Sequence, residues 1–329
     1  LYRQVAESIN ELKLETKIHI PLGGPSASSW FANLDGNTIA TPERSLVYEL
    51  IKLCSRYRLP LDFISWHGFS TSPVLEKENT IYKKPVVNLI RDWLTYFNFE
   101  RATPLIVDEW NYDRDANVLP ERKEEAYIGA SFIPSRIKNM YEAGIDYQAY
   151  FSLEDFQNNK EGIIRNVGVF YFNGEHSEYK GQAKSIYNVF RMLSSLGGGM
   201  FLSKLEDEFA GVIATKSDDS IVLLVYNYSD PEIVMGFLSK NISNLNGAGR
   251  KILLNLIRSK KLDEIMLRQL NVATMRGLTN KLKAMLKKAQ ELNDSARRLQ
   301  TNPRNIKIGL KNLQDTYLYE RYSVDSACR

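Results

Sequence analysis

Cysteine and long apolar runs are both scarce in this chain of 329 residues. The two cysteines, Cys54 and Cys328, are too few for a disulfide-stapled scaffold. No segment approaches the about 18 consecutive apolar residues of a transmembrane helix, so no membrane insertion is predicted. Only three histidines occur, and no cluster of His, Asp and Glu has metal-ligand spacing. The sequence therefore implies neither a metal nor another cofactor, and its composition assigns no cellular compartment.

The basic residues are unevenly distributed along the chain. Residues 250–311 hold 16 Lys and Arg against four Asp and Glu, and they include no aromatic residue. Surfaces that bind single-stranded nucleic acid combine basic with aromatic side chains, so no nucleic-acid partner is expected. A solvated helical face is the favoured interpretation. A scaffold or nucleic-acid-binding role through this segment is the minor alternative.

Residues 1–198 alternate between strand and helix patterns. Strands are predicted at 17–25, 61–69, 104–110 and 146–153, and each is followed by apolar residues at helical spacing. Apolar strands separated by helices favour a parallel sheet that is covered by those helices.

The pattern changes after residue 198. Residues 211–217 and 220–229 alternate like the strands of a hairpin with its turn at 217–219, and 316–325 predicts a late strand. Apolar residues between 257 and 302 recur at helical spacing, and packing of this stripe on itself is favoured over a groove for a partner. We expect a small β-sandwich domain over 199–329 with a helical insertion at about 257–302.

Glycine or polar residues stand at or just after the carboxyl end of each predicted strand in the first part of the chain. They are Gly23 and Gly24, His67, Glu109, and Glu154 with Asp155. The carboxyl ends of parallel strands meet at one edge, which is where β/α barrels hold their active sites. A complete barrel has eight strands, whereas four are predicted here.

Four of these segments occur in the order and spacing of one enzyme family. They are HIPLGGPS (19–26), LDFISWHGF (61–69), LIVDEWN (105–111) and GIDYQAYFSLEDF (144–156). Together they resemble glycoside hydrolase family 39, the β-xylosidases and α-L-iduronidases, whose members are retaining (β/α)8 TIM-barrel enzymes. The resemblance implies that residues 1–198 are the C-terminal half of such a barrel, with strands five to eight.

The resemblance also assigns roles to single residues. It implies that Glu109 is the nucleophile, the carboxylate that attacks the anomeric carbon in a retaining mechanism. His67 would lie beside the sugar, and the glycines would let the backbone approach it closely. The predicted substrate-binding residues are His67, Trp110, Asn111, Gly23, Gly24, Glu154 and Asp155.

Each assignment has an ordinary structural alternative. In this alternative, Glu109 is an ion-paired carboxylate of a loop, and His67 is a core histidine whose ring nitrogens are hydrogen-bonded. The two glycines would then form a simple turn, and Glu154 and Asp155 would belong to a solvated loop. The Trp-Asn pair after Glu109 would hold the loop instead of lining the site. Strand alternation directs Asp108 to the face opposite Glu109, toward a covering helix.

Three departures from the family pattern affect the predicted function. Phe69 stands where the family has a tyrosine that bonds the nucleophile, and Phe151 stands where it has a tryptophan. The family's acid/base is the glutamate of an Asn-Glu-Pro on strand four. The Asn10-Glu11 pair of this chain falls within a predicted helix and lacks the proline.

We therefore expect a retaining hydrolase of a β-xyloside or related glycoside, in a chain that lacks the acid/base and is inactive alone. The alternative is a catalytically silent carbohydrate-binding or interaction protein on the same scaffold. A carbohydrate is the expected partner in both cases. Self-association through the open edges of a half barrel is also expected, because unpaired strand edges are pairing templates.

Overall fold

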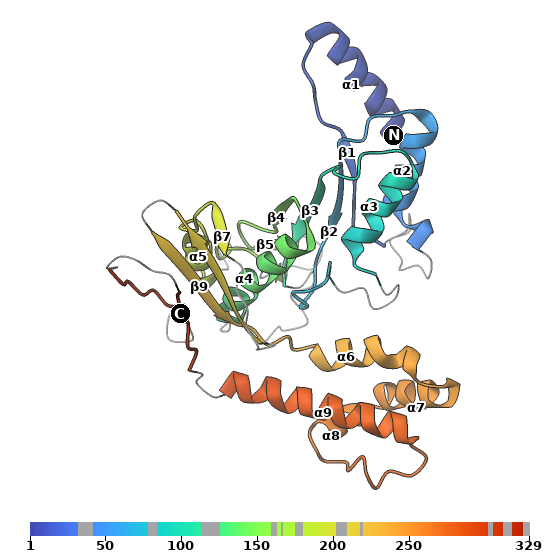
Figure 1. Cartoon of the computed structure of the whole chain (residues 1–329), viewed down its shortest axis with the longest axis vertical. Coiled ribbons are helices and arrows are strands. Elements are labelled where there is room, and N and C mark those ends of the chain that lie inside the picture. Colours follow the sequence, from blue (N-terminus) through green and yellow to red (C-terminus); the bar gives the residue numbers. More distant parts are fainter. Residues whose placement is uncertain are drawn as a thin grey trace.

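The computed structural model describes residues 1–31, 42–77, 84–112, 126–158, 163–165, 167–174, 180–201, 209–217, 220–301, 305–311 and 318–324. Within these ranges a four-stranded parallel sheet with helices is followed by a short hairpin, a three-stranded antiparallel sheet and a group of helices (Figure 1). The predicted α/β architecture with a parallel sheet is confirmed.

The parallel sheet has the strand order β1-β2-β3-β4. Its strands are β1 (Gly23–Ala27), β2 (Phe63–His67), β3 (Leu105–Trp110) and β4 (Tyr147–Tyr150). The helices of this part are α1 (Tyr2–Thr16), α2 (Leu46–Tyr57), α3 (Val86–Tyr96), α4 (Ala126–Ala143) and α5 (Ser185–Leu193), with a 3-10 turn η1 (Pro42–Arg44) before α2. The strands lie in the sheet in the same order as in the chain, and one of the helices α2, α3 and α4 connects each pair of neighbouring strands. This part of the chain is therefore a repeated strand–helix–strand motif.

One difference from the sequence prediction concerns the first strand. A strand was expected at 17–25, but β1 begins only at Gly23 and continues to Ala27. Residues 18–22 lie outside any strand. The Gly-Gly-Pro stretch, which favours a tight turn in isolation, instead pairs with β2 from Gly23 onward.

A single apolar core lies between the sheet and its helices. Ile64 and Trp66 of β2 and Leu105 and Val107 of β3 are fully buried in it. Each such side chain contributes about 1.5–3 kcal/mol of burial free energy. Because side chains alternate along a strand, the residues between them, such as Ser65 and His67, belong to the opposite face.

The second sheet is antiparallel and packs on α4. It contains β7 (Gly199–Phe201), β8 (Ala210–Lys216) and β9 (Ile221–Asn227), so the predicted hairpin strands are present. Part of the predicted turn, at 218–219, lies outside the described residues. A late strand was expected at 316–325, but its described part, 318–324, contains none. Side chains there, such as Leu318 and Tyr319, are 90% and 80% exposed, so their alternating pattern has no sheet to pack against.

The helical segment begins earlier than predicted. It comprises α6 (Ile233–Asn241), the 3-10 turn η3 (Ile242–Asn244), α7 (Gly247–Arg258), α8 (Lys261–Met266) and α9 (Asn280–Thr301). Helix thus starts at Ile233, well before residue 257. These helices share a core of their own, including Leu238, Leu253 and Leu286, and form a separate group in Figure 1. The prediction that the apolar stripe packs on itself is confirmed.

Two further observations complete the fold. A short hairpin that was not predicted, β5 (Phe156–Asn158) with β6 (Ile163–Arg165), follows β4. Among the described helices, none combines the length and the apolar character that crossing a membrane requires.

Candidate active site

His67 and Glu109 stand at the same edge of the parallel sheet. His67 is the last residue of β2, Glu109 is the second-last residue of the adjacent β3, and the parallel register sets them opposite each other. His67 Nδ1 lies 3.5 Å from Glu109 Oε2. The two side chains are 19% and 39% exposed, so both are partly open to solvent. The structure thus brings together an imidazole and a carboxylate that the sequence singled out separately.

Asp108 also faces this imidazole, and the prediction that it points toward a covering helix is wrong. Its Oδ1 lies 3.8 Å from His67 Nε2. The strand register shifts between Trp66 and His67 on one side of β3 and between Val107 and Trp110 on the other. Irregularities of this kind break the two-residue alternation of side chains. Two consecutive carboxylates can therefore approach one histidine.

Ser26 reaches the same histidine from β1. Its Oγ lies 3.1 Å from His67 Nε2, and its backbone N–H donates to Ser65 Oγ at 3.2 Å. Its φ of 54° is in the left-handed region, which is uncommon for a residue with a side chain. Ser26 was not predicted as a site residue, although its place directly after Gly-Gly-Pro was a usable signal.

A row of phenylalanine rings borders His67. The Phe69 ring centroid lies 6.2 Å from that of His67 and 5.9 Å from that of Phe151, which in turn lies 5.9 Å from Phe156. All three contacts are edge-to-face, a favoured aromatic geometry. The two residues that depart from the family pattern, Phe69 and Phe151, are thus direct neighbours beside the histidine.

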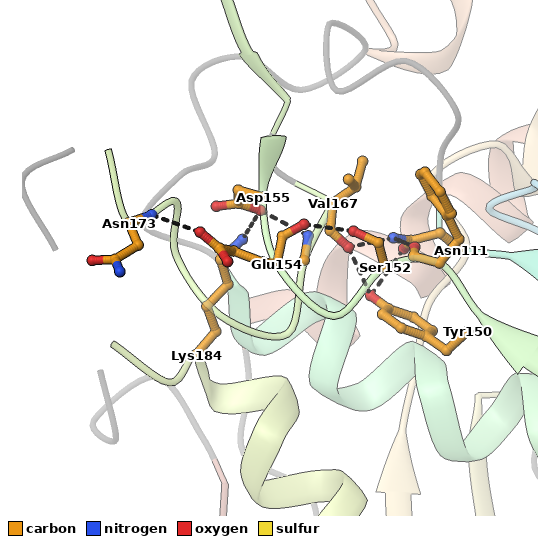
Figure 2. A network of polar contacts seen from close by, with 10 residues as sticks. Asn111, Tyr150, Ser152, Glu154, Asp155, Val167, Asn173 and Lys184 are labelled. Atoms are coloured by element: carbon orange, nitrogen blue, oxygen red, sulfur yellow. Dashed lines mark hydrogen bonds and ion pairs between the residues drawn. The ribbon is translucent and has the colours of Figure 1, made fainter. Parts of the chain in front are cut away.

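Trp110 and Asn111 are engaged inside the protein. Trp110 is 1% exposed and packs against Phe132 and Tyr150. Asn111 Nδ2 donates to the Phe151 carbonyl at 2.6 Å and to the Val167 carbonyl at 2.8 Å, and its Oδ1 accepts from the Tyr150 hydroxyl (Figure 2). This geometry favours the alternative that both residues hold the loop after β4.

Asp155 forms a buried ion pair in the same network. Its Oδ1 accepts from Lys184 Nζ at 2.6 Å and from the Gly168 N–H at 2.7 Å (Figure 2). Burial raises the pKa of Asp155 and lowers the pKa of Lys184, because the loss of hydration outweighs their attraction on both sides. Since Asp155 is 4% exposed, the geometry favours a structural role for it.

Glu154 differs from its neighbour in exposure. It is exposed, and its Oε1 accepts from the Asn173 backbone N–H at 2.7 Å (Figure 2). Of the two carboxylates predicted after β4, Glu154 is therefore the one that solvent and a ligand can reach.

Gly23 allows β1 and β2 to approach closely. A Cβ atom at this position would lie 2.2 Å from the Phe63 carbonyl oxygen, which no side chain tolerates. Gly24 has a φ of 143°, a conformation that side-chain-bearing residues rarely adopt. Both glycines thus have a backbone role that is independent of any ligand.

A buried ion pair that our sequence analysis missed supports the turn after His67. Arg136 of α4 and Glu76 are 0% and 1% exposed, and Arg136 Nη2 donates to Glu76 Oε1 at 2.6 Å. The same Nη2 donates to the Gly68 carbonyl at 3.3 Å. Because the partners are 60 positions apart, no local pattern reveals them. In the described ranges, no group of three or more His, Cys, Asp or Glu side chains is placed to hold a metal ion.

Comparison of the sequence with models of protein families shows to which family the chain belongs. The model of Glycosyl hydrolases family 39 matches residues 1–276. The chain belongs to glycosyl hydrolase family 39. The resemblance that the four motifs indicated is thereby confirmed.

Individual relatives of this family 39 chain are distant and longer. A beta-xylosidase of Caldicellulosiruptor saccharolyticus is 24% identical over 243 residues, covering 70% of this chain and 44% of that protein. A glucosidase structure from Croceicoccus marinus gives a TM-score of 0.51 at 17% identity, covering 70% of this chain and 44% of that one. The GH39 enzyme from Xanthomonas axonopodis pv. citri gives a TM-score of 0.45 at 18% identity, covering 70% and 42%. The chain thus spans less than half the length of these relatives.

Proposed function

We propose that this chain carries the nucleophile of a retaining glycoside hydrolase that acts on a β-xyloside or a related glycoside. The observation that carries the proposal is the Glu109 carboxylate, partly exposed at a strand end and 3.5 Å from His67, in a chain of family 39. In a retaining mechanism this carboxylate attacks the anomeric carbon and forms a glycosyl-enzyme, which water then hydrolyses. The xyloside preference rests on the similarity to the beta-xylosidase of Caldicellulosiruptor saccharolyticus.

The neighbouring residues support this chemistry in distinct ways. A strand end is a rigid mount, so Glu109 is held close to its productive position. His67 contacts Glu109 and, in the proposal, a sugar hydroxyl. Phe69 and Phe151 form an apolar wall against which the sugar's C–H groups pack. Glu154 is the second polar contact, whereas Trp110, Asn111 and Asp155 are assigned mainly to holding the loops.

The proposal includes a second half of the barrel. β1 and β4 are the edges of the parallel sheet, and neither has a second strand partner in the described part of the chain. Helix α1 exposes apolar side chains, including Val5, Leu12 and Leu14. Four further strands would cover these surfaces and supply the acid/base glutamate. Residues 1–198 are then the barrel portion, and 199–329 an accessory domain whose sandwich form stays a prediction.

The test uses the full-length polypeptide that contains this chain and an aryl β-xyloside. We expect Glu109→Gln to lower kcat by on the order of 10³-fold or more, because no other group forms the covalent intermediate. Glu11→Gln, an exposed carboxylate on α1, is the matched control and should retain the wild-type rate. Wild-type turnover by Glu109→Gln would remove Glu109 from the mechanism.

A catalytically silent carbohydrate-binding protein is the second candidate function. It is favoured by Phe69 and Phe151, which place two phenyl rings without polar groups in contact beside His67. Calorimetry with xylose and xylobiose separates the candidates. Saturable binding by the full-length polypeptide, together with no hydrolysis of any aryl glycoside, would support the silent protein and contradict the enzyme.

A further inference from the structure

Ser26, His67 and Glu109 have the arrangement of a serine-hydrolase triad. Ser26 Oγ lies 3.1 Å from His67 Nε2, and the other ring nitrogen, Nδ1, lies 3.5 Å from Glu109 Oε2. The three residues come from the neighbouring strands β1, β2 and β3. A nucleophile, a base and an orienting carboxylate in this order are the geometric signature of such sites, whatever the fold.

The carboxylate determines which nitrogen of His67 is free to act as a base. The Glu109 carboxylate, 3.5 Å from Nδ1, favours the tautomer that carries its proton on Nδ1, and this tautomer leaves the lone pair of Nε2 for the Ser26 hydroxyl. Asp108, whose Oδ1 lies 3.8 Å from Nε2, adds a second negative charge next to the ring. Both carboxylates stabilise the imidazolium that forms when the ring takes up a proton.

The backbone presents Ser26 as an accessible nucleophile. Its φ of 54° is uncommon for a serine, and such strained residues cluster at functional sites. Ser26 lies at the register irregularity of β1 between Pro25 and Ala27. The nucleophile of α/β-hydrolases also has a strained backbone, although it occupies a turn after a strand. Ser26 is exposed, its backbone N–H donates to Ser65 Oγ at 3.2 Å, and its hydroxyl lies 3.1 Å from His67 Nε2.

We propose that this triad hydrolyses short acyl esters. Ser26 Oγ attacks the ester carbonyl carbon while His67 Nε2 takes the hydroxyl proton. The bond from the carbonyl carbon to the alcohol oxygen breaks, and the imidazolium gives its proton to that oxygen. Water, deprotonated by His67, then cleaves the acyl-serine, releases the carboxylic acid and restores the Ser26 hydroxyl.

The ester class follows from the surroundings of the triad. The site lies open at the sheet edge and is bordered by the phenyl ring of Phe69, which suits a small acyl group such as acetyl. An O-acylated sugar is the substrate class that we assign, and this part rests on the proposed glycosidase function. Ester cleavage by the triad does not depend on that function.

The first experiment uses this chain with 4-nitrophenyl acetate and an alkyl fluorophosphonate probe. We expect Ser26→Ala and His67→Asn each to lower kcat/KM by about 10²-fold or more. Ser29→Ala, in the same segment, should leave the rate unchanged. Digestion of labelled wild-type protein should place the phosphonate on Ser26, a result that does not depend on any variant folding. Unchanged rates in a folded Ser26→Ala protein, or labelling elsewhere only, would overturn the triad.

The second experiment tests the sugar part with O-acetylated xylo-oligosaccharides and measures released acetate. Release of acetate by the wild-type protein, together with its loss in Ser26→Ala, supports O-acylated sugars as the substrate class. Cleavage of the aryl acetate without release from the acetylated sugars overturns that class. If ester cleavage persists where the full-length polypeptide cleaves no glycoside, only the glycosidase proposal fails.

Discussion

His67 Nδ1 lies 3.5 Å from Glu109 Oε2, across two adjacent parallel strands. The contact follows from the topology, because parallel strands that end at one edge set their last side chains side by side. Behind it, Arg136 and Glu76 form a buried pair that bonds the Gly68 carbonyl and supports the turn after His67. The position of the histidine therefore depends on the sheet and on helix α4 together.

The packing of Gly68 against Arg136 gives the first prediction. A Cβ atom at Gly68 would lie 2.8 Å from Arg136 Nη2 and 2.8 Å from Val107 Cγ1. We expect Gly68→Ala to destabilise the protein by about 1–3 kcal/mol, because neither buried neighbour can move away freely. Denaturant unfolding measures this change. Gly198→Ala, with nothing within 4 Å of its added methyl group, is the control; equal losses in both variants would contradict the packing argument.

The ion pair of Lys184 and Asp155 gives a prediction about buried charge. Both side chains are 3% exposed. We expect Lys184→Met to cost about 3–5 kcal/mol, because Asp155 is left buried without its partner. The double variant Asp155→Asn with Lys184→Met should recover most of this loss in urea unfolding. A double variant no more stable than Lys184→Met would show that the buried charge is not the cause.

Cys54 gives a prediction about pH. Burial raises its pKa from 9.0 to about 11. The protonated thiol is thus favoured in the folded state, so its contribution to stability is complete below pH 9 and is lost as the pH rises through about 11. In a Cys328→Ser background, we expect Cys54 to resist a disulfide reagent at pH 8 until denaturant is added. Rapid reaction of the native protein would contradict this burial.

The open sheet edges give a prediction about association. We expect this chain alone to self-associate in light scattering, because β1 and β4 each present an unpaired edge within the described sheet. Ala149→Lys, at an exposed position of β4, should weaken the association, since edge charges block strand pairing. Ala284→Lys is the control, because it adds the same charge at an exposed position of α9, away from the sheet edge. A stable monomer in the wild type would contradict the prediction.

Several elements of the fold could be predicted because their signals are local. β2 and β3 appear as mainly apolar runs that stop at polar residues, and this pattern also led to His67 and Glu109. Helix α6 was missed because its apolar pattern is short and lacks the length that separates helix from strand. The late strand was expected from alternation alone, which does not show whether a partner exists.

The missed parts of the site depend on tertiary structure. Asp108 was assigned to the wrong face because the register irregularities beside β3 arise only when the strands pair. Arg136 and Glu76 meet across 60 positions, and Ser26 meets His67 across 41. No periodicity connects residues at such separations, so their contacts could not be read from the sequence.

Covalent labelling shows directly whether Glu109 is the nucleophile. The full-length polypeptide is incubated with an activated 2-deoxy-2-fluoro-β-xyloside, which slows hydrolysis of a glycosyl-enzyme, and is then digested for mass spectrometry. We predict one sugar on the peptide that contains Glu109, and no label in Glu109→Gln, whereas Glu11→Gln labels as the wild type does. Label on another carboxylate, with Glu109→Gln still labelled at the wild-type rate, would contradict the assignment of Glu109 as the nucleophile.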